Sequence, residues 1–157
     1  MMRIIAGKFK NNKLFISTNE ETRPLKDMTK ESIFNTLVHS KKFPFKFKNS
    51  KILDLYSGTG SFGLECLSRD SDKVTFVESS KNALKILRKN IDKLNVERKT
   101  VIIEESVFNY LSNINNFNYK QDLIFLDPPY KEQDIFGLIN NIFKANILKK
   151  KWINYYT

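Results

Sequence analysis

From residue 51 onward, short β-prone runs alternate with amphipathic helical patterns. The expected strands are 51–56, 73–78, 100–105 and 122–127, with a further possible strand at 151–156, and the expected helices are 61–69, 80–95, 107–115 and 132–147. Runs such as LIFL are continuously apolar, which is typical of strands buried on both faces of a parallel sheet. The alternation predicts a doubly wound, Rossmann-like α/β fold with helices on both faces and strand order 3-2-1-4-5.

Residues 1–50 precede this pattern and are expected to form an N-terminal extension to a Rossmann-like domain at 51–157. The runs RIIAGK (3–8) and NKLFIS (12–17) predict a β-hairpin, and an apolar stripe at one face predicts a helix over 27–40. The next segment, 41–50, alternates Phe with Lys. These rings either cover an edge of the core or interleave with nucleic acid.

Composition narrows the class of protein. The chain has 157 residues, 41% of them hydrophobic and 28% charged, which suits one globular domain with a small appendage. We find no apolar run of about 18 residues or more, so we expect a cytoplasmic protein with no membrane partner. A single cysteine, Cys66, excludes an intrachain disulfide, and a single histidine, His39, argues against a metal site. We expect Cys66 to pack in the core.

Positive charge is concentrated near the N-terminus. The net charge is +10, and residues 1–51 hold 12 Lys and Arg against 4 Asp and Glu. This distribution favours a nucleic-acid-binding face, with Arg3, Lys8, Lys10 and Lys13 as candidate contacts. The alternative is an ordinary solvated surface in a lysine-rich composition, since lysine outnumbers arginine by 22 to 5.

The stretch DLYSGTGSFG (54–63) follows the first strand of the alternating pattern. Gly58, Gly60 and Gly63 spell GxGxxG, and Glu78 ends the next strand. A carboxylate at that place accepts hydrogen bonds from the two vicinal hydroxyls of a ribose. The pattern therefore predicts a nucleoside cofactor at the carboxyl ends of the strands.

Asp54 selects among nucleoside cofactors. Its carboxylate, just before the glycine loop, would repel a pyrophosphate but suits an ammonium group, which favours S-adenosyl-L-methionine over NAD. The alternative is that Asp54 orders the loop by accepting backbone N–H bonds. The other expected cofactor-binding residues are Tyr56 in the loop, Ser79 after Glu78, and Ser106 and Val107 at the adenine edge.

The run FLDPPY (125–130) ends the fourth strand of the pattern, which the expected order places beside the first. Asp127 and the carbonyl of Pro128 can accept the two hydrogens of an exocyclic amine on a base, so that its lone pair points at a methyl group. Pro129 holds the backbone outward, and Tyr130 can stack on a flipped base. These four residues are the predicted catalytic set, and the alternative is a simple strand-ending turn.

The segments RIIAGKFKNNKL, TRPLKDMTKESIFNTL, ILDLYSGTGSFGLECLSR and IFLDPPY together resemble the bacterial 16S ribosomal RNA guanine-N2 methyltransferases. The resemblance implies a class I methyltransferase fold, S-adenosyl-L-methionine as methyl donor, and ribosomal RNA or the small ribosomal subunit as partner. Arg23 and Pro24 match the N-terminal motif of that family, which adds Arg23 to the expected RNA contacts.

The chain departs from that family at its C-terminal end. The family continues past the fifth strand into a helix and an antiparallel strand pair, whereas this sequence stops at Thr157, so we expect a shortened sheet. Two other functions stay open: an amine methyltransferase acting on another base in RNA or DNA, and an inactive RNA-binding module. The sequence does not determine the oligomeric state, and a monomer is our working expectation.

Overall fold

The parallel sheet predicted from residue 51 onward is present. The computed structural model describes residues 2–16, 27–41, 44–114, 120–129, 132 and 134–149. Its four-stranded parallel sheet has the order β5-β4-β3-β6. The strands are β3 (Lys51–Leu55), β4 (Lys73–Val77), β5 (Thr100–Ile103) and β6 (Leu123–Leu126). This is the predicted order as far as the described strands extend.

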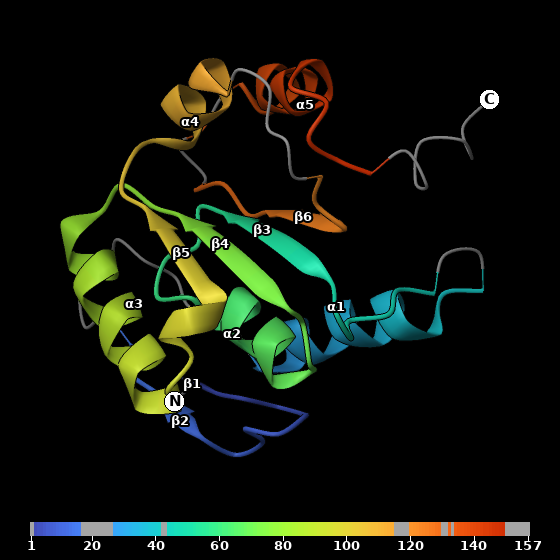
Figure 1. Cartoon of the computed structure of the whole chain (residues 1–157), viewed down its shortest axis with the longest axis vertical. Helices are drawn as coiled ribbons and strands as arrows, with labels where there is room; N and C mark the ends of the chain where they lie inside the picture. The colour runs from blue at the N-terminus through green and yellow to red at the C-terminus, as the bar shows by residue number, and fades with distance from the viewer. Residues whose placement is uncertain are drawn as a thin grey trace.

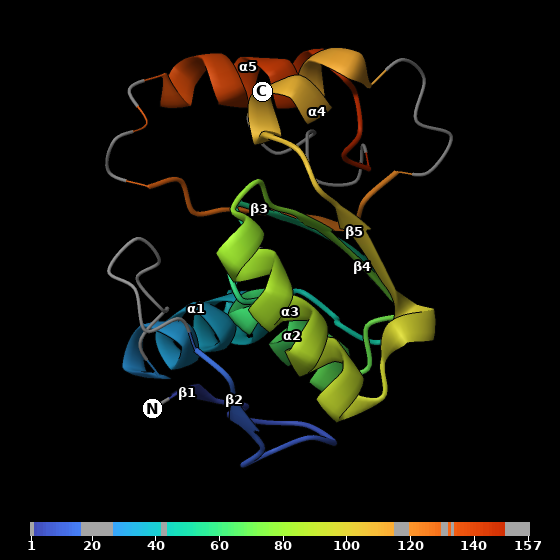
Figure 2. The same ribbon diagram turned by 90° about the vertical axis from the view of Figure 1, so that its left-hand side faces the viewer.

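Helices cover both faces of the sheet (Figure 1). Helices α1 (Asp27–His39), α2 (Ser61–Ser68) and α3 (Lys81–Leu94) lie on one face, and α4 (Val107–Asn113) and α5 (Ile135–Lys144) lie on the other. A short 3-10 helix, η1 (Glu97–Lys99), precedes β5 and was not predicted. Figure 2 shows these three layers edge on, with the N-terminal hairpin beyond the α1, α2 and α3 layer.

The centre of the sheet is better buried than its β6 side. Strand β3 pairs with β4 and β6, and Ile52, Leu53 and Leu55 are fully buried. All four residues of β6 are only partly buried, so the prediction of a strand covered on both faces holds less well there. An isolated parallel bridge joins Gln121 to Leu148, which brings the chain back beside β6 after α5. The possible strand at 151–156 lies outside the described residues.

The N-terminal hairpin is present, but its strands are shorter than predicted. They are β1 (Met2–Arg3) and β2 (Lys13–Leu14) instead of 3–8 and 12–17. The reason is that the N–H groups of the turn segment bind α2. Those of Ile5 and Ala6 donate to the Glu65 carboxylate at 2.7 and 3.0 Å, and that of Lys8 donates to the Ser68 carbonyl at 2.8 Å. Backbone donors used in this way cannot join a strand ladder.

Helix α1 forms where its apolar stripe predicted it. Phe34 is fully buried and stacks on Phe62 of α2, with ring centroids 5.0 Å apart. Phe45 and Phe47 are both buried and pack edge to face at 4.8 Å. These two rings of the segment 41–50 therefore cover the core and are not available to interleave with nucleic acid, while Phe43 lies outside the described residues.

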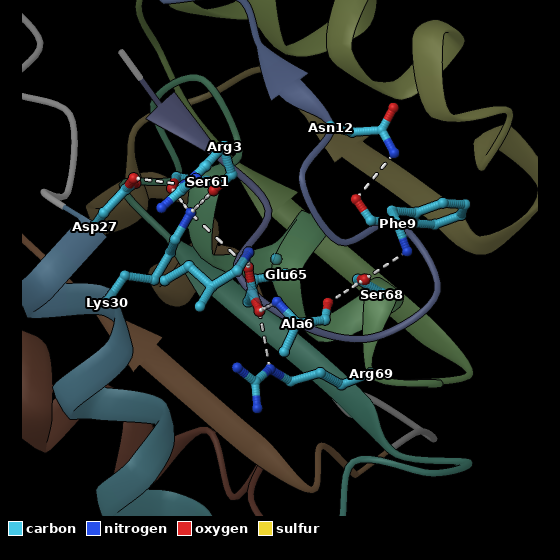
Figure 3. Close-up of polar contacts among 12 residues, drawn as sticks. Arg3, Ala6, Phe9, Asn12, Asp27, Lys30, Ser61, Glu65, Ser68 and Arg69 are labelled. Atoms are coloured by element: carbon cyan, nitrogen blue, oxygen red, sulfur yellow. Dashed lines mark hydrogen bonds and ion pairs between the residues drawn. The ribbon is translucent and has the colours of Figure 1, made fainter.

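A buried carboxylate joins the extension to the sheet domain (Figure 3). Glu65 of α2 is fully buried, and besides Ile5 and Ala6 it accepts a hydrogen bond from Arg69 Nε at 3.0 Å. Lys30 of α1 is also fully buried, and its Nζ lies 3.9 Å from Glu65 Oε2. Lys30 Nζ donates to the Arg3 carbonyl at 2.5 Å and to Ser61 Oγ at 3.3 Å. One carboxylate thus organises contacts from the segment after β1, from α1 and from the C-cap of α2.

Two further sequence predictions concerned Cys66 and membrane-spanning segments. Cys66 is fully buried in the core as expected, and burial raises the pKa of its thiol. Within the described ranges, the helices are too short or too polar to cross a membrane.

The Glu65 network generates a stability prediction. Glu65→Ala should lower the free energy of unfolding by about 3 to 5 kcal/mol, because it leaves the buried Lys30 ammonium without its counter-charge and the partly buried Ile5 and Ala6 N–H groups without their acceptor. Urea denaturation followed by circular dichroism would measure this. Glu97→Ala, at an exposed position, is the control and should change stability by less than about 0.5 kcal/mol. A Glu65→Ala loss below about 1 kcal/mol would contradict the proposed dependence.

Candidate active site

The predicted cofactor and base-binding motifs meet at one edge of the sheet. Leu55 at the end of β3 pairs with Val77 of β4 on one side and with Leu126 of β6 on the other. All three strands run parallel, so the residues that follow them emerge at the same edge. These are the glycine loop after β3, Glu78 after β4 and Asp127 after β6.

The glycine loop turns sharply into α2. Gly60 caps the helix with φ of 86°, a conformation that side chains disfavour, and a Cβ there would lie 2.4 Å from Leu87 of α3. A Cβ on Gly63 would lie 2.3 Å from the Phe76 ring of β4. The glycines therefore allow α2 to pack closely against α3 and the sheet, which sets the position of the loop.

Glu78 holds the glycine loop from the neighbouring strand. Its Oε2 accepts from the Gly58 N–H at 2.7 Å, and its Oε1 accepts from the N–H groups of Ser79 and Ser80 at 2.9 and 2.8 Å. Each carboxylate oxygen has two lone pairs, so Oε2 can still accept a hydrogen bond from a hydroxyl. Ser79 was predicted to bind the cofactor. In this structure its backbone N–H already donates to Glu78.

Asp54 lies beneath the loop. It is 1% exposed, and its Oδ2 accepts from the Gly63 N–H at 3.0 Å. This contact is the loop-ordering role that the sequence left open as an alternative. Burial raises the pKa of Asp54 to about 8, with Asp127 and Glu78 adding to the rise and the Gly63 hydrogen bond opposing it. Contact between the second oxygen, Oδ1, and an ammonium group stays a prediction.

Tyr56 joins the glycine loop to the chain after β6. Its hydroxyl donates to Glu132 Oε2 at 2.9 Å, and Glu132 N–H donates to the Pro129 carbonyl at 2.8 Å. Burial, and then Glu132, raise the pKa of Tyr56. Sequence reasoning missed Glu132, and its only signal was an acid two residues after the DPPY motif. The structure thus turns the Tyr56 hydroxyl toward the base-binding motif.

Ser106 and Val107 lie where β5 leads into α4. Ser106 caps the helix by accepting from the Asn109 N–H at 3.2 Å, and Val107 is 2% exposed within the core on that face. The Ser106 hydroxyl oxygen therefore already accepts a hydrogen bond as the N-cap of α4. The Val107 N–H belongs to the first helical turn, whose N–H groups have no partner within the helix. Contact between these residues and adenine stays a prediction.

The base-binding motif is partly described. Phe125 of β6 stacks on Phe62 of α2 with centroids 3.8 Å apart, which fixes the strand that carries Asp127. Partial burial raises the pKa of the Asp127 carboxyl. Among the described residues, none donates a hydrogen bond to that carboxylate or to the Pro128 carbonyl. Tyr130 lies outside the described residues, so its stacking role stays a prediction.

The three candidate RNA-binding lysines are not gathered at this edge. Arg3 lies near the start of α2, where its Nε is 3.3 Å from Asp27 Oδ2. Lys8, Lys10 and Lys13 are exposed, but the hairpin that carries them is bound to the far ends of two helices. The Lys8 N–H binds Ser68 at the end of α2, and Lys93 Nζ near the end of α3 binds the Lys13 carbonyl at 2.7 Å. Arg23 lies outside the described residues.

In the described part of the chain, no three His, Cys, Asp or Glu side chains gather in a way that could hold a metal ion.

Solved structures define the class. A candidate methylase of Haemophilus influenzae matches with a TM-score of 0.72 and 33% identity, over 94% of this chain and 76% of that one. A candidate methyltransferase of Escherichia coli matches with a TM-score of 0.78 and 24% identity, over 94% and 75%. An SAH-bound methyltransferase of Podospora anserina shares the fold with a TM-score of 0.55 and 22% identity, over 64% and 42%. The fold is that of a class I S-adenosylmethionine-dependent methyltransferase.

Sequence relatives define the family. Residues 2–156 match the family model described as Conserved hypothetical protein 95. The ribosomal RNA small subunit methyltransferase D of Haemophilus influenzae is 37% identical, over 94% of this chain and 76% of the relative. The protein of the same name from Buchnera aphidicola subsp. Baizongia pistaciae is 32% identical, over 98% of this chain and 74% of the relative. The chain belongs to the ribosomal RNA small subunit methyltransferase D family, and its cofactor is S-adenosylmethionine, as predicted.

The residues at the sheet edge fit this cofactor. A Cβ added at Gly58 would meet no atom within 4 Å, so the loop is open on that side. Glu78 retains a lone pair for a ribose hydroxyl, and Asp54 retains Oδ1 for an ammonium group. We expect these three residues to hold the cofactor.

The raised pKa of Asp54 generates a pH prediction. If the ammonium group of the cofactor favours the ionised carboxylate, Asp54 must lose a proton on binding whenever the pH is below about 8. Affinity for S-adenosylmethionine should then rise between about pH 5.5 and 7.5, by up to about tenfold per pH unit. Isothermal calorimetry would measure it, with Asp54→Asn as a variant whose affinity should not respond to pH in this way. Equal slopes for both proteins would restrict Asp54 to ordering the loop.

Proposed function

We propose that this protein transfers a methyl group from S-adenosylmethionine to the exocyclic N2 amine of a guanine in 16S ribosomal RNA. Family membership supports methylation of small-subunit ribosomal RNA, since the relatives carry that name. The choice of guanine N2 comes from the sequence resemblance and from the chemistry of the Asp127 motif. We also propose that residues 1–50 act as the RNA-facing extension and 51–157 as the methyltransferase domain.

The observation that carries the proposal is the position of Asp127. Strand β6 lies directly beside β3, so Asp127 and Pro128 follow the strand next to the glycine loop. Their carboxylate and carbonyl oxygens are acceptors, and no described residue donates a hydrogen bond to either of them. Two acceptors beside a methyl-donor site suit an amine with two hydrogens.

The chemistry follows from holding that amine. An exocyclic amine is a weak nucleophile because its lone pair is delocalised into the base. When Asp127 and the Pro128 carbonyl accept its two hydrogens, the nitrogen can become tetrahedral and direct its lone pair outward. The bound cofactor supplies an electrophilic methyl group on its sulfonium, whose sulfur keeps the electron pair of the broken bond. The nitrogen then releases one proton, which Asp127 is placed to accept.

Substrate size follows from the separation of the two ends of the molecule. Helix α3 has 14 residues and is therefore about 21 Å long, with Glu78 and Ser80 near its start and Lys13 bound near its end. The hairpin therefore meets α3 toward the opposite end from Glu78. A large folded RNA or a ribosomal subunit can reach both, which favours the small subunit as substrate over a short stem.

Asp127→Ala tests the base-binding role. Affinity for S-adenosylmethionine should stay nearly unchanged, while single-turnover methylation of small subunits should slow by roughly 100-fold or more, because a preorganised acceptor is lost. Calorimetry and methylation with labelled cofactor would be run side by side. Analysis of the methylated nucleoside would identify the atom modified.

Three results would contradict the proposal. An Asp127→Ala protein that folds, binds cofactor and methylates at the parent rate would show that Asp127 only ends a strand. A modified adenine or cytosine would indicate another amine methyltransferase. A parent protein that binds subunits without methylating them would indicate an RNA-binding module.

The hairpin lysines give a separate prediction for RNA binding. Replacing Lys8, Lys10 and Lys13 together by Glu should weaken subunit binding and reduce the slope of its salt dependence, because fewer phosphate counterions are released. Cofactor affinity should not change, since these three exposed side chains make no hydrogen bond or ion pair to the described residues of the glycine loop or to Glu78. Replacing Lys81, Lys85 and Lys89 on α3 by Glu is a matched control for net charge. Equal losses in both triple variants would show a general charge effect instead of a hairpin contact.

A further inference from the structure

Asn90 is a polar side chain in the middle of α3 that no motif accounts for. It is fully buried, although it lies among the apolar residues Leu87, Ile91 and Leu94 that face the core. An amide at such a position is costly unless its hydrogen-bonding groups are satisfied. Its partners therefore indicate why the helix carries it.

The Asn90 amide makes three hydrogen bonds to two distant segments. Its Oδ1 accepts from the Phe15 N–H at 2.7 Å, and its Nδ2 donates to the Phe15 carbonyl at 3.0 Å. Nδ2 also donates to the Thr59 carbonyl at 3.0 Å. Both N–H groups and the carbonyl oxygen are thus used, and only a primary amide of this length offers that set.

The two partners belong to the two functional parts of the molecule. Phe15 follows β2 in the N-terminal extension, and Thr59 lies between Gly58 and Gly60 of the glycine loop. A second buried contact joins the same parts, since Lys30 Nζ bonds both the Arg3 carbonyl and Ser61 Oγ at the start of α2. The loop that holds the cofactor is therefore fixed to the extension at two points.

We propose that Asn90 is a positioning residue for methyl transfer: through Phe15 and Thr59 it fixes the glycine loop relative to the RNA-facing extension. The inference rests on the proposed function for its substrate. Because methyl transfer requires the reacting atoms to lie about 3 to 3.5 Å apart, a small shift between these two parts slows the reaction even when both ligands are bound. Ordering the loop should also order Phe15, because one amide bonds both.

Asn90→Asp is the informative variant. It has the same size and can still accept from the Phe15 N–H, but it places a carboxylate against the carbonyl oxygens of Phe15 and Thr59. Leu94→Ala is the control, since it removes buried volume from the same face of α3 and the leucine side chain has no hydrogen-bonding group to link the loop and the extension. Both variants would be compared at a temperature at which circular dichroism shows them fully folded.

Two measurements test the inference. The first is the single-turnover rate on small subunits with both ligands saturating: Asn90→Asp should lose tenfold or more, and Leu94→Ala should remain within about twofold of the parent. The second needs no RNA. Hydrogen exchange at the Phe15 amide should slow when S-adenosylmethionine is added to the parent or to Leu94→Ala, and should not respond in Asn90→Asp.

The outcomes separate this inference from the proposed function. A Phe15 amide that does not respond to cofactor in the parent, or a folded Asn90→Asp protein with the parent rate, would overturn the role of Asn90. An equal loss of rate in both variants would also overturn it, because it would show a general effect of stability. A parent that does not methylate subunits but shows the Phe15 response would refute the proposed function and leave the coupling through Asn90 intact.

Discussion

The whole arrangement depends on one buried carboxylate, that of Glu65. A charge in the interior is unfavourable unless it is paired and hydrogen-bonded. Here backbone donors from the hairpin, the Arg69 guanidinium and the Lys30 ammonium surround it. The contact is specific because apolar packing alone would allow the hairpin to slide along α2. With Glu65 in place, the hairpin has one position, and Arg3 lies at the end of α2 that begins at the glycine loop.

Burial has a second effect at the cofactor edge. Asp54 and Asp127 both have raised pKa values because the protein shields them from water, and Asp54 also feels the negative charge of its neighbours. Three acidic side chains, including Glu78, thus face one region of the described structure. Such a region suits a ligand with positive charge and hydroxyl groups, and it disfavours phosphates. The charge distribution therefore separates the cofactor edge from the basic hairpin, to which we propose that recognition of the RNA backbone falls.

The sequence predicted the sheet and the placement of its motifs because both depend on local patterns. The apolar runs of β3, β4 and β6 and the glycines after β3 mark strand ends directly, so the edge that collects Asp54, Glu78 and Asp127 could be derived. Contacts between distant segments could not, because periodicity contains no partner identity. Glu65, Asn90 and Glu132 were missed for that reason. Lys30 did leave a signal, since a lysine on the same helical face as Phe34 must find a buried partner. The hairpin strands were predicted too long because their donors bind α2 instead of each other.

The docking of the hairpin has a consequence for the order of events during synthesis. Ile5 bonds a residue 60 positions later in the chain, and Phe15 bonds one 75 positions later. At about 5 to 20 residues per second, the partner of Phe15 is translated roughly 4 to 15 s after Phe15 itself. During that interval the nascent extension has no surface to settle on. The segment made first therefore acquires its structure only after α2 and α3 have left the exit tunnel.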